Sequence, residues 1–162
     1  MKFQQIRNAT VIITFAGKRF LVDPWLDPKD ACDPIPFARD PTQRFPIFPL
    51  PLPIEKIIDV DAIIVTHMHV DHFSEYSANL LNKEIPIFAQ DEEEKEILDK
   101  LGFKHAEVLS KDVTTFGNIS IYRTNTNHGE EKIYDAFHMK RAVAGFVLSS
   151  PSESKKIYLV AY

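Results

Sequence analysis

The start of the chain alternates short runs of β-branched and aromatic residues with turn residues. These runs occupy residues 3–7, 10–15 and 19–22, and Asn8-Ala9 and Ala16-Gly17-Lys18 separate them. Runs of this composition between turn signals predict strands. Because the separating turns are short, the pattern favours an antiparallel meander.

The pattern changes between residues 23 and 53, where nine of the eleven prolines lie. Proline fixes φ and lacks a backbone N–H, so this composition excludes a long helix or a central strand. Trp25, Phe37, Phe45 and Phe48 make the segment too apolar for a solvated linker. We therefore expect one long ordered loop that packs over another part of the fold, such as the mouth of a site.

Strand and helix patterns alternate after this loop. Residues 61–65 form an apolar, β-branched run typical of a strand buried on both faces, and residues 86–89 form a second short strand. A helix-like segment covers residues 74–81. A further helix is predicted to begin after Asp91, with Glu94 at its N3 position. Its expected apolar stripe consists of Ile97, Leu98 and Leu101, and Gly102 is placed to end it.

Strand patterns return in the last third of the chain. They cover residues 106–109, 113–116, 119–123, 142–149 and 156–161, with a tight hairpin turn at Gly117-Asn118 and a polar, irregular stretch over 124–141. A meander, then alternating strands and helices, then hairpins suits two sheets packed face to face with helices outside. The expected class is a mixed α/β (α+β) fold.

Composition narrows the classes of protein. A chain of 162 residues with 44% hydrophobic and 26% charged residues suits a single domain spanning 1–162, with 23–53 as a proline-rich loop inside it. The net charge of −4 argues against a nucleic-acid partner. No stretch resembles a signal peptide or a membrane span, so we expect a cytoplasmic protein without a membrane partner. Cys32 is the single cysteine and is expected to be a bystander.

Candidate chemistry is concentrated in Thr66-His67-Met68-His69-Val70-Asp71-His72, directly after the strand at 61–65. If the extended conformation continues, His67 and His69 point to one side while Met68 and Val70 turn into apolar packing. Asp71 and His72 then approach from another direction and could serve a second ion. Clustered histidine and carboxylate at a strand end predicts a metal site, and these ligand types suit Zn²⁺, Mn²⁺ or Fe.

Other residues carry open alternatives. His128 precedes Gly129 in a polar loop and fits a third ligand, whereas His138 is a weaker candidate for contacting substrate, and His105 is expected to have no site role. Asp23 either only initiates a turn before Pro24 or accepts a ring N–H from a ligand histidine. Trp25 and the loop phenylalanines could line a pocket or simply pack. The arginines that could meet an anionic substrate, or be ordinary surface charges, are Arg39, Arg44, Arg123 and Arg141.

The HxHxDH pattern of residues 67–72 resembles the signature of the metallo-β-lactamase superfamily. Within it, the chain looks like the branch of metal-dependent hydrolases that includes ascorbate-6-phosphate lactonase. The other matching features, in order, are Leu21-Val22-Asp23-Pro24-Trp25-Leu26, the proline-rich loop, the capped helix after Asp91, and Asn127-His128-Gly129.

This resemblance implies an αββα sandwich of two mixed sheets with a dinuclear metal centre at one edge. It implies that His67, His69 and His128 hold the first ion and that Asp71 and His72 belong to the second. The family's pattern continues with Gly-Asp after the strand that ends this chain, so the resemblance also implies that the usual C-terminal portion is missing and the second half is incomplete.

The function expected from the resemblance is hydrolysis of a small ester, lactone or phosphoester, with Zn²⁺ as the favoured ion, one or two per chain, and Asp71 as a catalytic residue that orients or shuttles a proton. The alternative is a catalytically impaired metal-binding or oligomeric binding module. Because an incomplete sandwich leaves apolar surface and an unpaired sheet edge, we expect a homo-oligomer.

Overall fold

The computed structural model describes residues 1–34, 39–127 and 142–160. In these ranges the strands are β1 (Lys2–Arg7), β2 (Thr10–Phe15), β3 (Lys18–Val22), β4 (Ala62–Ile64), β5 (Ile87–Ala89), β6 (Ala106–Val108), β7 (Thr114–Phe116), β8 (Ile119–Asn127), β9 (Ala142–Ser149) and β10 (Ile157–Leu159). The helices are α1 (Ile54–Ile57), α2 (Glu75–Leu80) and α3 (Glu92–Lys100). Of the helices that the structure describes, none has the length and apolar character needed to cross a membrane.

The larger sheet has six strands in the order β1-β2-β3-β4-β5-β6. β1, β2 and β3 form the predicted antiparallel meander, which is confirmed. β3, β4, β5 and β6 then pair in parallel. Because neighbouring parallel strands end at the same edge, the residues after β3 and β4 meet there, as the pairing of Val22 with Ile64 requires.

The smaller sheet has four strands in the order β10-β9-β8-β7, and every described pair in it is antiparallel. The expectation of a second mixed sheet is therefore wrong for the described strands. β8 also runs to Asn127, beyond the predicted end at Arg123, because its polar residues pair with β9. Gly145 of β9 allows this pairing, since a Cβ there would lie 2.5 Å from Thr124 Oγ1 and 2.8 Å from Leu159 O.

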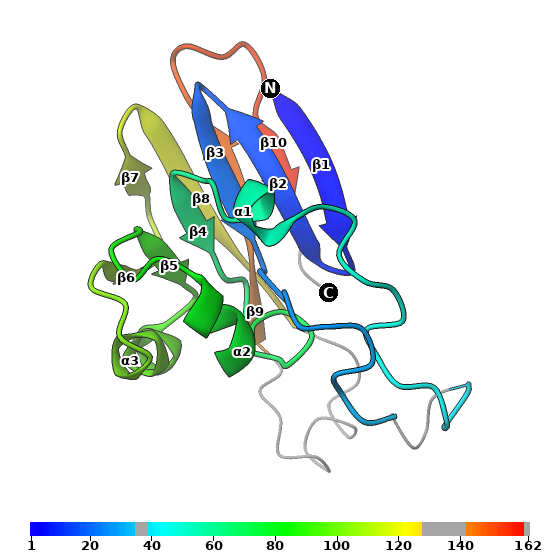
Figure 1. Cartoon of the computed structure of the whole chain (residues 1–162). Coiled ribbons are helices and arrows are strands. Elements are labelled where there is room, and N and C mark those ends of the chain that lie inside the picture. The colour runs from blue at the N-terminus through cyan, green and yellow to red at the C-terminus, as the bar shows by residue number, and fades with distance from the viewer. Residues whose placement is uncertain (35–38, 128–141, 161–162) are drawn as a thin grey trace.

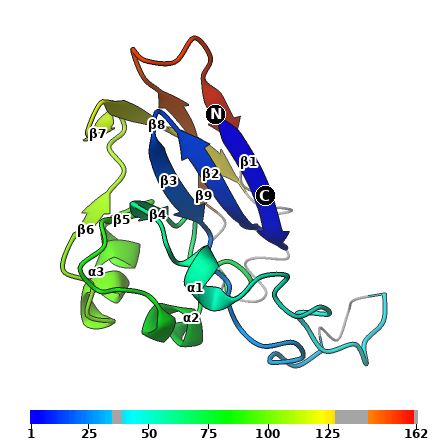
Figure 2. The ribbon, with the colours of Figure 1, turned by 45° about the horizontal axis from the view of Figure 1, so that its top comes forward.

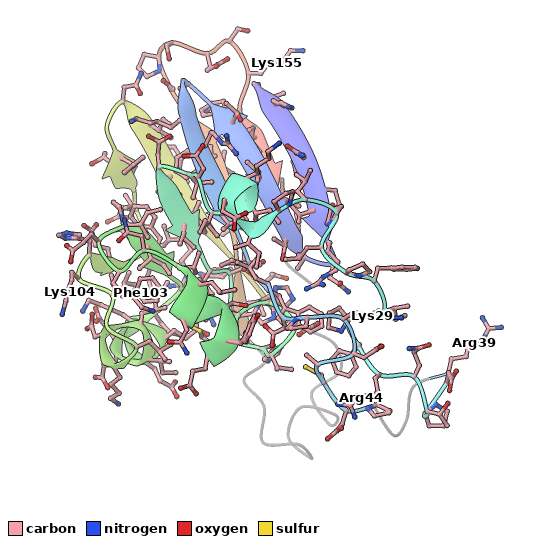
Figure 3. All side chains as sticks on the ribbon, viewed as in Figure 1. Lys29, Arg39, Arg44, Phe103, Lys104 and Lys155 are labelled. Atoms are coloured by element: carbon pink, nitrogen blue, oxygen red, sulfur yellow. The ribbon has the colours of Figure 1, made fainter. Side chains whose placement is uncertain are left out.

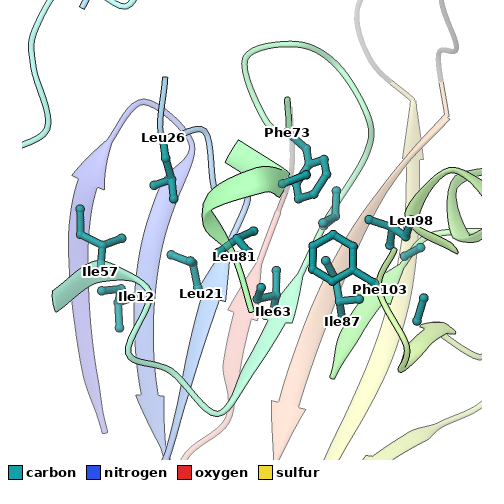
Figure 4. Packing of buried hydrophobic residues seen from close by; sticks show 14 of the residues in the cluster. Ile12, Leu21, Leu26, Ile57, Ile63, Phe73, Leu81, Ile87, Leu98 and Phe103 are labelled. Carbon is teal, nitrogen blue, oxygen red and sulfur yellow. The ribbon is translucent and has the colours of Figure 1, made fainter. Parts of the chain in front are cut away.

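Alternation along the strands of the larger sheet builds two separate apolar layers. Phe20 and Ile64 face the smaller sheet and pack with Phe146 and Leu148, forming the core between the sheets. Their neighbours in sequence, Leu21 and Ile63, point to the opposite face and contact the helices. Figure 4 shows this second layer. Leu21 and Ile63 lie beneath Leu81, and Ile87 lies beneath Phe103. The two-sided burial predicted for residues 61–65 is confirmed.

All three described helices cover the same outer face of the six-stranded sheet (Figures 1 and 2). The prediction of two packed sheets with helices outside is confirmed, in the layer order helix, sheet, sheet. The fourth layer of the expected αββα sandwich is not found among the described residues. α3 begins at the predicted N-cap Asp91 and ends before Gly102, whose φ is +92°. Ile97 is 39% exposed, so its assignment to the buried stripe was wrong.

The described part of the proline-rich segment 23–53 contains no helix and no strand, as predicted, apart from a bridge between Cys32 and Phe45. Arg7 anchors its two ends. The buried guanidinium donates to the carbonyls of Trp25 and Asp27 through Nη2 and to that of Phe48 through Nη1.

Residues 39–44 of this segment are exposed and do not close over the fold. Arg39 and Arg44 extend away from the sheets (Figure 3), and the Phe48 side chain is 70% exposed. The expectation that the whole loop packs over another part of the molecule is therefore wrong for residues 39–44 and for the Phe48 side chain. Residues 39–44 are polar or charged apart from Pro41, so they offer little apolar surface to bury.

Asp61 joins the start of β4 to the start of β3 and provides a test of this register. Its carboxylate accepts from Lys18 Nζ at 2.9 Å and from Arg19 N at 2.8 Å. Partial burial opposes ionisation, but these hydrogen bonds outweigh it and lower the pKa of Asp61 below its ordinary 3.8. Because the pKa is lower in the folded than in the unfolded protein, the ionised carboxylate stabilises the fold at pH values above the unfolded pKa. This contribution is lost as the pH falls through the folded pKa.

We expect Asp61→Asn to lower the free energy of unfolding by about 1 kcal/mol at pH 7, a modest value because the pair is partly exposed to solvent. The difference from wild type should shrink below about pH 4. Urea unfolding at pH 7 and pH 3 measures it, with Asp112→Asn, in the exposed turn before β7, as the control. An equal difference at both pH values would contradict the assignment.

Candidate metal centre

The candidate site lies where the parallel strands β3 and β4 end. Asp23 directly follows β3, and its backbone N–H donates to Ile64 O at 3.0 Å. Asp23 adopts φ +46°, in the left-handed region that aspartate tolerates better than most residues. The chain therefore turns sharply at this point, and the carboxylate is directed toward the segment that follows β4.

The Asp23 carboxylate binds three groups of that segment. Oδ1 accepts the backbone N–H of Thr66 at 2.7 Å, and Oδ2 accepts the Thr66 hydroxyl at 2.8 Å. Oδ2 also lies 3.0 Å from His72 Nδ1. Asp23 is only 2% exposed, so these contacts replace its hydration. The two interpretations of Asp23 from the sequence are therefore compatible. Its backbone makes a turn, and its side chain contacts the ring of a histidine.

These contacts also determine which nitrogen carries the proton in the His67 and His72 rings. Thr66 donates its hydroxyl proton to Asp23, so its oxygen is left to accept from His67 Nδ1, 3.1 Å away. His72 likewise donates from Nδ1 to Asp23. In its neutral form each of these two rings is thereby held with its proton on Nδ1. Their Nε2 atoms carry the lone pairs that a metal ion requires.

The three histidine rings of the motif lie against one another. The His67 ring centroid is 4.4 Å from that of His69 and 3.8 Å from that of His72. The predicted convergence of His67 and His69 is therefore confirmed, although β4 ends at Ile64 and no strand carries them. His69 O instead accepts the N–H groups of His72 and Phe73, which makes a turn.

The two apolar residues of the motif behave differently. Met68 packs on the helix-side core as predicted. Val70 is 54% exposed, so the expectation that it turns into apolar packing is wrong. The turn that begins at His69 breaks the strand alternation on which that expectation depended.

Electrostatics couple His72 to the two carboxylates beside it. Burial disfavours the charged imidazolium, but the hydrogen bond to Asp23 and the charges of Asp23 and Asp71 outweigh burial and raise the pKa of His72 above its ordinary 6.5. Asp71 itself is exposed. The site thus combines a buried carboxylate, Asp23, with an exposed one, Asp71.

A cavity of about 570 Å³ adjoins Asp23, Asp71 and His72. Its remaining walls come from β1, β2 and the turn between them, and from residues 157–160. They consist of Phe3, Gln5, Asn8, Ala9, Val11, Ile157, Tyr158, Leu159 and Val160. One end of the cavity is therefore polar and the rest is mostly apolar.

The structure also shows the surroundings of most of the other residues that the sequence singled out. Trp25 is buried and packs on Phe45, so packing rather than pocket lining describes it. Arg44 binds Asp33 and the carbonyl of Asp30 inside the loop, and Arg123 binds the carbonyl of Gln90. His105 directly precedes β6, is exposed and lies near Glu84. His128, His138 and Arg141 lie outside the described residues.

Two residues that hold this region, Arg7 and Glu94, were not predicted from the sequence to do so. Buried Arg7 anchors the segment after Asp23, and the carboxylate of Glu94 accepts the Met68 N–H at 3.1 Å. No periodicity marks Arg7, which occupies a strand end. Glu94 was noted only as an N3 residue of α3.

Comparison with known proteins identifies the family. A family model described as a beta-lactamase superfamily domain matches residues 18–160. The chain belongs to the beta-lactamase superfamily. The resemblance drawn from the histidine motif is thereby confirmed, whereas the closer likeness to ascorbate-6-phosphate lactonase stays a prediction.

Relatives within the superfamily share most of this chain. The UPF0173 protein YddR of Bacillus subtilis (strain 168) is 38% identical over 98% of the chain and 61% of its own length. An isothiocyanate hydrolase from Delia radicum gut bacteria superposes with a TM-score of 0.86 at 36% identity, and a possible metal-dependent hydrolase from Veillonella parvula DSM 2008 with 0.88 at 30%. Each covers 98% of this chain, which in turn spans 61% of theirs.

The metal implied by the superfamily was compared with the side chains present. Among residues 1–34, 39–127 and 142–160, no group of three or more His, Cys, Asp or Glu side chains is arranged to hold an ion. The donor chemistry nevertheless fits, because Thr66 and Asp23 hold two adjacent rings through Nδ1, which makes Nε2 the nitrogen through which each would bind an ion. The described residues thus fit part of a metal site, and the predicted ligand His128 lies outside them.

Asp23 supplies the test of this geometry. We expect Asp23→Ala to lower the free energy of unfolding of the metal-free protein by about 3 kcal/mol, because it leaves buried donors unpaired. The raised pKa of His72 means that its charged form stabilises the fold below about pH 6.5, and that contribution is lost as pH rises through the folded value. The effect of Asp23→Ala should therefore be larger at pH 6 than at pH 8.

Urea unfolding at the two pH values measures this difference. Asp27→Ala is the matched control, because Asp27 is also buried but binds Ser74 and Ser77 instead of a histidine. It should destabilise the protein to about the same extent at both pH values. A loss below about 1 kcal/mol for Asp23→Ala, or one independent of pH, would contradict the account of Asp23.

Proposed function

We propose that this chain provides the metal-binding region of a metal-dependent hydrolase that acts on a small molecule. The observation that carries the proposal is the pair of imidazoles, His67 and His72, whose Nδ1 atoms are held by Thr66 and Asp23. Membership of the superfamily supports it. The names of two similar structures, an isothiocyanate hydrolase and a possible metal-dependent hydrolase, support it further.

In this proposal His67 and His69, together with His128, hold a first ion, and Asp71 and His72 belong to a second. Zn²⁺ is the favoured ion because it prefers imidazole and carboxylate ligands, with Mn²⁺ or Fe as alternatives. When bound, the ion supplies Lewis acidity toward the group under attack and lowers the pKa of water.

The side chains of the chain then have distinct tasks. Asp23 keeps the His72 ring oriented and compensates positive charge from behind it. Asp71 is exposed beside the cavity, where its carboxylate can accept a proton from the attacking water and return it to the leaving group. This proton transfer makes Asp71 the proposed catalytic residue.

The cavity indicates the size and polarity of the substrate. A volume of about 570 Å³ suits a small molecule, and its apolar walls from β1 and β10 suit an apolar substituent. We propose a small ester, lactone or phosphoester. The similar isothiocyanate hydrolase adds isothiocyanates as a fourth class to examine.

Metal binding tests the ligand assignment. We expect wild-type protein to bind at least one Zn²⁺ per chain and His67→Ala to lose that ion, because the removed imidazole is a ligand. Elemental analysis after removal of free metal measures the stoichiometry. His105→Ala is the matched control and should keep the wild-type stoichiometry, so an equal loss in both variants would show that the assignment is wrong.

Turnover tests the reaction class. Zinc-loaded protein should hydrolyse at least one of a lactone, an aryl ester, a phosphodiester and an isothiocyanate probe, and Asp71→Asn should lower kcat by about 10²–10⁴-fold because it removes the proton acceptor. Bound zinc without turnover on any probe would favour the alternative, a metal-binding module. Sedimentation at several protein concentrations tests the homo-oligomer that we also propose.

A further inference from the structure

The carboxylate of Glu94 lies in the first turn of α3 and is buried behind the histidine motif. We propose that Glu94 is a positioning residue that holds the backbone between His67 and His69 in its ligand-binding geometry. This inference rests on the proposed function, since it assigns Glu94 a task only if these histidines bind a metal ion.

The contact is direct and selective for one peptide group. Glu94 Oε1 accepts the Met68 N–H at 3.1 Å, and Met68 is the residue that separates the two histidines. The carboxylate is only 3% exposed, so the hydrogen bond forms in surroundings of low polarity. Because a charged acceptor makes a stronger hydrogen bond than a neutral one, Glu94 restrains this peptide more firmly than an amide would.

Gln90 extends this restraint to the smaller sheet. Its Nε2 donates to Glu94 Oε1 at 2.6 Å and to Ala142 O at 3.0 Å. Ala142 is the first residue of β9 and pairs with Asn127, the last residue of β8. The Glu94–Gln90 pair thus connects the histidine motif, which follows β4 of the larger sheet, to the end of β8 and the start of β9 in the smaller one.

Retention of a charge at this position needs a reason beyond helix capping. The side chain of Asp91 already caps α3 by accepting the Glu94 N–H at 3.1 Å. A buried carboxylate costs desolvation energy, which a neutral side chain would avoid. When ionised, Glu94 places a negative charge at the peptide that separates His67 from His69. This charge favours a cation bound by those histidines and offsets the desolvation cost when the ion is present.

Zinc affinity tests the proposal. Zn²⁺ alone is titrated into the full chain in competition with a chromogenic chelator, at a temperature where circular dichroism shows each variant folded. We expect Glu94→Ala to weaken zinc binding by about 10–100-fold, the usual range for residues that orient metal ligands. Glu94→Gln, which keeps an acceptor oxygen but loses the charge, should weaken it by at least about threefold.

Glu92→Gln is the matched control, because it removes a charge from the exposed face of the same helical turn. Its affinity should stay within about twofold of wild type. The visible spectrum of the Co²⁺-substituted protein gives a second readout, and its band positions should shift in the Glu94 variants but not in the control. A loss of stability alone would not shift them.

The outcomes separate the two proposals. Wild-type zinc affinity in either folded Glu94 variant would overturn the positioning role and leave the proposed function intact. A wild-type protein that binds no zinc would overturn the proposed function, and the role of Glu94 with it. If Glu94→Ala does not fold, Glu94→Gln decides the question by the same criterion.

Discussion

The buried Asp23 carboxylate is the contact on which the arrangement of the site depends. It accepts the backbone and hydroxyl of Thr66 and contacts the His72 ring, and through Thr66 it also determines the orientation of His67. A buried carboxylate is stable only when such donors replace its hydration. The same hydrogen bonds that offset the desolvation of Asp23 therefore leave both Nε2 atoms as potential ligands.

The parallel pairing of β3 and β4 brings these groups together. Their common edge places Asp23 beside Thr66, although 42 residues, most of them in the proline-rich loop, separate the two in sequence. Further contacts fix the segment after β4 from other sides, since Ala144 N donates to Thr66 O at 3.0 Å and Glu94 accepts from Met68. The histidine turn is thus held from the meander, from α3 and from the smaller sheet.

The sequence predicted what depends on local pattern. Alternation and β-branched runs located the strands of both sheets, and the capping residue Asp91 located α3. It did not predict the exposure of Val70, because a turn formed by His69 O leaves no periodic signal. It also could not decide between the interpretations of Asp23 or find the role of Glu94. Both depend on partners that only the parallel pairing and the packing of α3 bring near.

X-ray absorption at the zinc edge reports the ligand atoms of the ion in the zinc-loaded full chain, and so shows whether the histidines of residues 67–72 bind it. We expect nitrogen scatterers at about 2.0–2.1 Å with the outer-shell pattern of at least two imidazoles. Oxygen ligands without imidazole, or a sulfur scatterer at about 2.3 Å from Cys32, would contradict this expectation.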